Sequence, residues 1–469
     1  MRSRNPVVFS ALVAALGGLL FGFDTAVISG TTDALQRVFS LDDFRLGFAV
    51  ASALIGTIVG AFTAGKPAEL FGRRRVLFVL AVLYFVSAAG SALAPSLAVF
   101  VAFRFIGGLA VGGASVVSPL YIAEIAPAHL RGRLVALNQL NVVAGILLAF
   151  LSNFLIAQSV GDLSAWRWML GVQVFPAALF FVLLFFIPES PRWLVKRGRP
   201  DEARLILQRI EQGDVERELA EIASSVTAET GHREAELFQR RYALPIFLAW
   251  TVAMLNQLSG INALMYYAPR IFRMAGAGAD DALLQAVAVG GTNLVFTALA
   301  LFVIDRFGRR PLLLVGGVGA ATSLALTAAG FYRGDATGHL VLVGLLGFIA
   351  FHAIGQGAVI WVFISEIFPN TVREKGQALG SFTHWFMAAV VSWTFPVVAQ
   401  ASGGHAFAFF AAMMVLQALF AWRIMPETKG LSLEELQRKL RLTVGEPATA
   451  RPPRAVPGID PIAGTDRPQ

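Results

Sequence analysis

Long apolar stretches alternate with short polar ones along most of the chain. A hydrocarbon core of about 30 Å needs roughly 20 apolar residues in a helix, and twelve stretches meet that length. They cover residues 7–29, 46–65, 75–94, 97–120, 134–157, 167–187, 243–268, 283–304, 311–331, 340–365, 376–399 and 405–425. The pattern therefore predicts an all-α membrane protein with twelve transmembrane helices.

One connection is much longer than the others, and it divides the spans into two groups of six. Within it, residues 201–211 and 216–226 are amphipathic and predict short helices. We expect four regions: a six-helix half at 1–187, a helical linker at 188–242, a second six-helix half at 243–425, and a short helix with a disordered tail at 426–469.

Motifs of the first half recur in the second in the same order. Phe71-Gly-Arg-Arg-Arg75 recurs as Phe307-Gly-Arg-Arg-Pro311, Tyr121-Ile-Ala-Glu-Ile-Ala-Pro127 as Phe363-Ile-Ser-Glu-Ile-Phe-Pro369, and Pro188-Glu-Ser190 as Pro426-Glu-Thr428. Chance matches would not keep that order. We infer that a six-helix unit was duplicated, with the axis relating the two halves along the membrane normal.

Composition and charge agree with this topology. Only 14% of the 469 residues are charged, whereas a soluble protein needs about a quarter. The net charge of +8 comes with Arg clusters at the ends of apolar stretches, which membrane topology explains better than nucleic-acid binding. Because positive residues stay inside, both termini are predicted to be cytoplasmic in the cell (inner) membrane. There is no cysteine, and we expect no metal or cofactor.

The repeated motifs place acids at one helix end and guanidinium groups at a neighbouring one. This pattern predicts a latch on the cytoplasmic side, formed when that side closes. Its expected members are the acids Glu124, Glu189, Glu366 and Glu427 and the arginines Arg73, Arg131, Arg309 and Arg373. The alternative is that the arginines only orient the protein in the membrane.

Two isolated charges lie within the spans, where each costs at least ~2.5–3.5 kcal/mol on insertion scales. Asp24 is near the outer end of the first span and Arg104 is in the first half of the fourth. An Asp facing an Arg across a bundle interior can act in proton coupling, because protonating Asp24 frees Arg104. A static structural ion pair is an equal alternative from these residues alone.

A second group of polar residues in the spans is neutral. It comprises Gln139 and Asn141, then Asn256, Gln257 and Asn262, then Asn293, and finally Trp361, His384 and Trp385. Amides offer donors and acceptors, and aromatic faces pack on C–H surfaces, which suits a neutral polyhydroxylated ligand. The alternative is hydrogen bonding between helices, and His384 alone is more typical of a packed histidine than of a proton relay.

From about residue 7 to residue 440 the chain resembles the sugar porter family of the major facilitator superfamily. The resemblance rests on the repeated motifs together with Gly22-Phe-Asp-Thr-Ala-Val-Ile-Ser-Gly30, Pro188-Glu-Ser-Pro-Arg-Trp193, Gln257-Leu-Ser-Gly-Ile-Asn262, Asp305-Arg-Phe-Gly-Arg309 and Pro426-Glu-Thr-Lys-Gly430. It implies alternating access around one central sugar site.

The resemblance also assigns expected roles. Matching positions imply sugar binding by Gln139, Gln257, Asn262, Asn293 and Trp361, with Phe21, Tyr266 and Trp385 shaping the pocket. Proton-coupled members are similar in carrying the Asp24 and Arg104 pair. Departures from the family pattern at Asn256, His384, Ala388 and Ala358, with an apolar Ile146, leave the particular sugar open.

The leading hypothesis is a transporter, not an enzyme, that imports a hexose or pentose by proton symport and acts as a monomer. The alternatives are a facilitative uniporter, a carrier for a polyol such as inositol, and a sugar sensor of transporter ancestry. An enzyme is disfavoured because no nucleophile–base constellation accompanies the amides.

Overall fold

The computed structural model describes residues 5–161, 163–210, 214–230, 236–334, 338–431 and 435–436. These residues form helices and their connections, with no strand among them. Twelve helical stretches are long and apolar enough to cross a membrane, and they confirm all twelve predicted spans.

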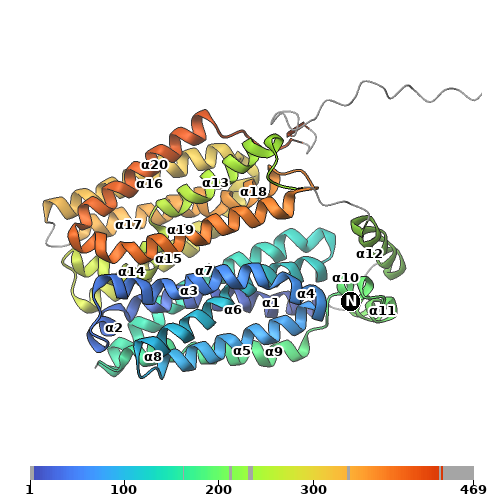
Figure 1. Cartoon of the computed structure of the whole chain (residues 1–469), viewed down its shortest axis with the longest axis horizontal. Coiled ribbons are helices and arrows are strands. Elements are labelled where there is room, and N and C mark those ends of the chain that lie inside the picture. The colour runs from blue at the N-terminus through green and yellow to red at the C-terminus, as the bar shows by residue number, and fades with distance from the viewer. Residues whose placement is uncertain are drawn as a thin grey trace, which may run out of the picture.

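The first six spans form one half of the molecule (Figure 1). They are α1 (Asn5–Val27) with the 3-10 turn η1 (Ile28–Gly30), α3 (Asp43–Thr63), α5 (Arg73–Ala92), α6 (Leu97–Ile125), α7 (Ala128–Val160), and α8 (Ala165–Gly171) continuing through α9 (Val174–Leu183) to η2 (Leu184–Phe186). Two short helices, α2 (Thr32–Val38) and α4 (Gly65–Phe71), join spans at opposite ends of this half.

The last six spans form the other half, and two of them are interrupted. They are η3 (Arg240–Tyr242) with α13 (Ala243–Leu258) and α14 (Ile261–Met274), α15 (Ala279–Phe307), α16 (Arg309–Arg333), α17 (His339–His352) with the π-helical turn η4 (Ala353–Gly357) and α18 (Ala358–Glu366), α19 (Arg373–Ala401), and α20 (Gly403–Arg423). Within α14 the backbone leaves the helical region at Tyr267 (φ −131°, ψ 16°), two residues before Pro269.

The linker forms three short helices at one end of the bundle (Figure 1): α10 (Pro191–Lys196), α11 (Pro200–Ile210) and α12 (Val215–Thr230). The two predicted amphipathic stretches are confirmed as α11 and α12. Their apolar faces share a small core with α10 that includes Trp193, Leu207 and Leu219. The predicted short helix at 432–435 and the tail that follows lie outside the described residues, apart from 435–436.

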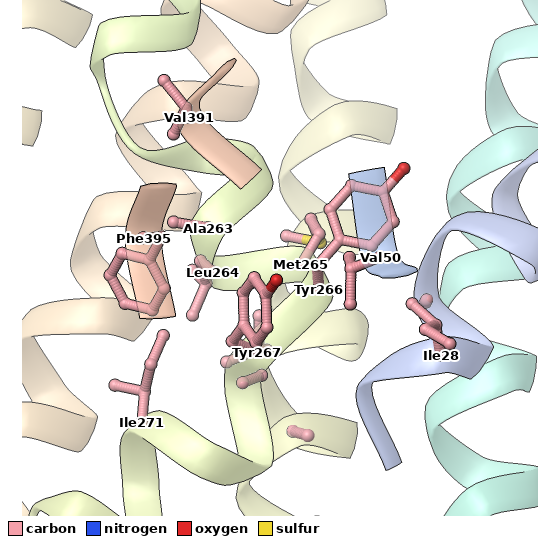
Figure 2. Packing of buried hydrophobic residues seen from close by; sticks show 14 of the residues in the cluster. Ile28, Val50, Ala263, Leu264, Met265, Tyr266, Tyr267, Ile271, Val391 and Phe395 are labelled. Atoms are coloured by element: carbon pink, nitrogen blue, oxygen red, sulfur yellow. The ribbon is translucent and has the colours of Figure 1, made fainter. Parts of the chain in front are cut away.

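We call the end of the bundle that carries α10–α12 and the repeated Arg motifs the motif end, and the other the opposite end. One apolar cluster joins the two halves towards the opposite end, where Ile28 and Val50 of the first half lie beside Tyr266 of the second (Figure 2). At the motif end each half has a separate cluster. The halves still touch at that end, where the rings of Phe62 on α3 and Phe382 on α19 lie 5.8 Å apart, measured between centroids, beside a cavity of about 480 Å³. The two halves therefore share one apolar core towards the opposite end and have separate cores towards the motif end.

Candidate functional site

Asp24 and Arg104 form a buried ion pair inside the first half. Arg104 Nη1 on α6 donates to Asp24 Oδ1 on α1 at 2.8 Å, and Nη2 lies 3.4 Å from the Asp24 carbonyl oxygen. Only 3% of the Asp24 side chain and 1% of the Arg104 side chain are exposed. Because a buried charge without its partner costs about 3–5 kcal/mol, a change in the charge of Asp24 must change the position or hydration of Arg104.

A cluster of amides lies in the second half around Gln257, at the end of α13. Asn262 Nδ2 donates to Gln257 Oε1 at 2.9 Å, and Gln257 Nε2 donates to Asn256 Oδ1 at 3.1 Å. The same Nε2 lies 3.1–3.2 Å from both ring nitrogens of His384 on α19. The break at Ser259 and Gly260 between α13 and α14 places these amides side by side.

Aromatic rings border the amide cluster. Trp361 and Trp385 each lie 4.9 Å from the His384 ring, measured between centroids. Trp385 also lies 5.6 Å from Phe21 of α1, so the aromatic wall crosses from one half to the other. Trp361 remains 39% exposed. Amides beside accessible indole faces can bind the hydroxyls and the C–H surface of a polyhydroxylated molecule.

Tyr266 links the amide side to the charge pair. It is buried on α14 in the same apolar cluster as Phe23 and Ala26 of α1, the segment that carries Asp24. On the next residue, the Tyr267 hydroxyl donates to the Ser392 carbonyl at 2.9 Å. A movement of α14 therefore changes the packing next to the amide cluster and against the segment of α1 that carries Asp24.

No hydrogen bond joins three of the expected sugar-site residues to the amide cluster within the described part of the chain. Gln139 is exposed on α7. Ile146, also on α7, is buried in the cluster that joins the halves. Asn293 is buried on α15 and accepts a hydrogen bond from Thr297 of its own helix at 3.3 Å.

The repeated motifs have the same geometry in both halves. Arg73 pairs with Glu124 through two contacts of 2.8 Å, and Arg309 pairs with Glu366 at 2.8 and 3.2 Å. In each half, a second acid accepts backbone N–H groups from the start of the Arg-bearing helix. Glu189 accepts them from α5, and Glu427 accepts them from α16.

Two predicted members of the latch have no acid partner among the described residues in this form. Arg131 is exposed and Arg373 contacts only the Phe368 carbonyl oxygen, so neither is paired with an acid in the described ranges. The four acids instead accept hydrogen bonds from Arg73, Arg309, backbone N–H groups and, for Glu366, the Thr428 hydroxyl. These contacts all lie within single halves. Closure between the halves at the motif end is therefore not needed to form them.

The two acids that accept backbone N–H groups differ in their pKa. Burial raises the pKa of Glu189 above its usual range, and the N–H donors offset this only in part. Burial also acts to raise the pKa of Glu427, but hydrogen bonds from the backbone of Lys429, Arg309 and Arg310 outweigh it, so that its pKa is lowered.

Ion pairs between the halves at the opposite end were missed by the sequence reasoning. Arg270 of α14 pairs with Asp43 of α3 at 2.6 Å and donates to Gln36 Oε1 at 2.9 Å. Arg273 of the same helix pairs with Asp33. The signal was two basic residues three positions apart on one helix, and acids in the connection between the first two spans.

Two halves built on one plan, with a charge pair in one and an amide-aromatic cluster in the other, define a secondary transporter of the major facilitator type. The chain belongs to the family described as sugar (and other) transporters, whose sequence model matches residues 10–440. It is 42% identical to the D-xylose-proton symporter of Escherichia coli strain K12, over 92% of this chain and 96% of that protein.

Two solved structures of that xylose transporter show the same fold. The inward-open conformation aligns with a TM-score of 0.82 at 40% identity, over 92% of this chain and 99% of that one. The complex with 6-bromo-6-deoxy-D-glucose aligns with a TM-score of 0.76 at 41% identity, over 93% and 99%.

Proposed function

We propose that this protein imports a monosaccharide, a pentose or a hexose, together with a proton by alternating access. In this proposal the motif end is the cytoplasmic side of the cell (inner) membrane, so both termini are cytoplasmic. The protein acts as a monomer. The observation that carries the proposal is the buried Asp24–Arg104 pair, whose helix α1 packs against Tyr266 of the helix that begins beside the amide cluster. The related D-xylose-proton symporter supports the substrate class.

The coupling follows from the cost of buried charge. In the outward-facing form, a proton neutralises Asp24 and releases Arg104 from the pair, and the sugar binds between the aromatic wall and the amides around Gln257. The halves then close at the opposite end and part at the motif end. After the sugar leaves, Asp24 loses its proton and pairs again with Arg104. The paired state in the present form corresponds to this last step.

The proposed sugar contacts are the residues of the amide cluster and the aromatic rings that border it. Gln257, Asn262, Asn256 and His384 offer hydrogen bonds, and Trp361, Trp385 and Phe21 provide apolar walls. We retain Gln139, Asn293, Ile146 and Tyr266 as contacts made when the halves close around the sugar.

Sugar uptake into proteoliposomes tests the proposal. Wild-type protein should accumulate D-xylose or D-glucose above equilibrium when the outside is acidic, and should accumulate myo-inositol less. The Asp24→Asn variant should lose accumulation but still exchange labelled for unlabelled sugar. Accumulation by Asp24→Asn equal to that of the wild type would disprove coupling through this residue, and wild-type uptake that ignores the pH gradient would indicate a uniporter.

A further inference from the structure

Two apolar hollows lie at the motif end, on either side of the segment that leads into α13. The first, which we call the α19 hollow, is the cavity of about 480 Å³ beside Phe62 of α3 and Phe382 of α19. The second, the α13 hollow, has a volume of about 500 Å³ and is lined by Phe247 and Trp250 among others. Phe238 lines both hollows, and 79% of it is exposed.

The hollows lie on a face of the protein that the membrane covers. Leu244, Phe247 and Trp250 follow one another at three-residue intervals along one side of the α13 span, and all three are exposed. On the α19 span, Phe382 and Phe386 are exposed and their rings stack at 5.8 Å. A continuous exposed apolar surface on membrane spans contacts hydrocarbon. The occupant of the hollows must therefore carry apolar chains.

The charges at the two hollows differ. The α19 hollow is lined by one acid, Glu236, and one base, Lys375. The α13 hollow is lined by Arg240, and no acid is among its described lining residues. The Arg240 side chain is exposed and forms no hydrogen bond or ion pair with the described part of the chain. Membrane topology accounts for a basic residue here, but not for its position at the rim of an apolar hollow.

We propose that this surface binds an anionic phospholipid from the leaflet at the motif end. Its phosphate pairs with Arg240, and its two acyl chains occupy the two hollows on either side of Phe238. Two hollows of nearly equal volume that share one wall suit a molecule with two chains. Arginine pairs well with phosphate, and basic residues beside a membrane surface attract anionic lipids. The site goes beyond the proposed transport and does not depend on it.

A lipid in this position contacts both halves of the protein. Phe62 belongs to the first half and Phe382 to the second, and their rings lie 5.8 Å apart at the edge of the α19 hollow. A relative movement of the halves therefore changes the shape of this hollow. The lipid thus bridges the halves at the end of the molecule where their cores are separate.

Native mass spectrometry of the full-length protein tests the site. The protein is titrated in detergent with phosphatidylglycerol, which is anionic, or with phosphatidylcholine of the same chains, and the bound lipid is counted. The wild type should bind phosphatidylglycerol more tightly than phosphatidylcholine. Arg240→Gln should weaken phosphatidylglycerol binding about fivefold, the effect of one basic residue near a membrane surface, and leave phosphatidylcholine binding unchanged. Phe238→Ala should weaken the binding of both lipids, because it removes the wall that the hollows share.

Arg423→Gln is the matched control. Arg423 is also exposed at the motif end of a span and lies beside an aromatic ring, 4.2 Å from that of Trp422, but it lines neither hollow. It should bind phosphatidylglycerol as the wild type does. Equal losses in Arg240→Gln and Arg423→Gln, or no loss in Arg240→Gln, would overturn the site. Displacement of the lipid by an equal concentration of glycerol 1-phosphate would show that the hollows contribute nothing, and would overturn it as well.

Discussion

Glu189 and Glu427 occupy equivalent positions in the two halves, yet their surroundings shift their pKa values in opposite directions. Because the pKa of Glu427 is lowered in the folded state, its ionised form stabilises the folded protein at pH values above the ordinary Glu pKa. This contribution is lost as the pH falls through the folded-state pKa. The raised pKa of Glu189 has the reverse effect: its contribution is present at low pH and is lost as the pH rises through the folded-state pKa.

This difference predicts opposite results for two matched variants. Between about pH 6 and pH 3, a range that spans the usual Glu pKa, the melting temperature of Glu427→Gln should fall less than that of the wild type. The melting temperature of Glu189→Gln should fall more. Intrinsic tryptophan fluorescence during heating measures both. A change of the same sign in the two variants would contradict the assignment.

Sequence reasoning placed Asp24 with Arg104, and Gln257 with Asn262 and His384, because an isolated polar residue in an apolar helix must find a partner. It did not find Arg270 with Asp43, or Arg273 with Asp33. Those contacts depend on which faces of distant helices meet, and contacts between the halves also depend on the conformational state. A single sequence carries neither kind of information directly.

At the scale of elements, hydropathy predicted all twelve spans, because span length follows from membrane thickness. It did not predict the π-helical turn η4 or the break at Tyr267 in α14. Periodicity describes a regular helix, whereas η4 lies at a close approach of two helices and the break at Tyr267 lies two residues before Pro269. At η4, for example, Gly355 approaches Gly316 so closely that a Cβ on Gly355 would lie 2.8 Å from the Gly316 Cα.

The turn before α5 provides a prediction at the scale of one element. Gly72 has φ +100°, and a Cβ there would lie 2.3 Å from Glu189 Oε2. The Gly72→Ala variant should lose about 1–3 kcal/mol through backbone strain, and more through displacement of Glu189. Gly334→Ala is the control, since Gly334 has φ +62° and nothing within 4 Å. Equal losses of thermal stability in the two variants would argue against a role for Glu189 in holding α5.

For the whole molecule, the form seen here is closed by apolar contacts and ion pairs at the opposite end. The side chains of Arg270 and Asp43 are only 15% and 10% exposed, so the pair is shielded from solvent. Replacing Arg270 by Gln leaves Asp43 without its partner and weakens closure at this end.

We therefore expect Arg270→Gln to shift the population towards the form that is open at the opposite end, by about tenfold, or ~1.4 kcal/mol. The natural absence of cysteine allows spin labels at Leu93→Cys and Tyr332→Cys, and electron–electron distance measurements would report longer separations. Arg45→Gln is the control, because its partner Asp42 is on the same half and both are exposed. Unchanged distances in Arg270→Gln would show that apolar contacts alone hold this end closed.

In the proposed cycle a proton crosses the membrane with each sugar through Asp24. Because the sugar is neutral, current recorded from proteoliposomes on a solid-supported membrane, together with labelled uptake, gives the charge moved per sugar. We expect about one elementary charge per sugar for the wild type and none for Asp24→Asn, with exchange intact in both. Electrically silent uptake by the wild type, or the same current in Asp24→Asn, would contradict the proposed cycle.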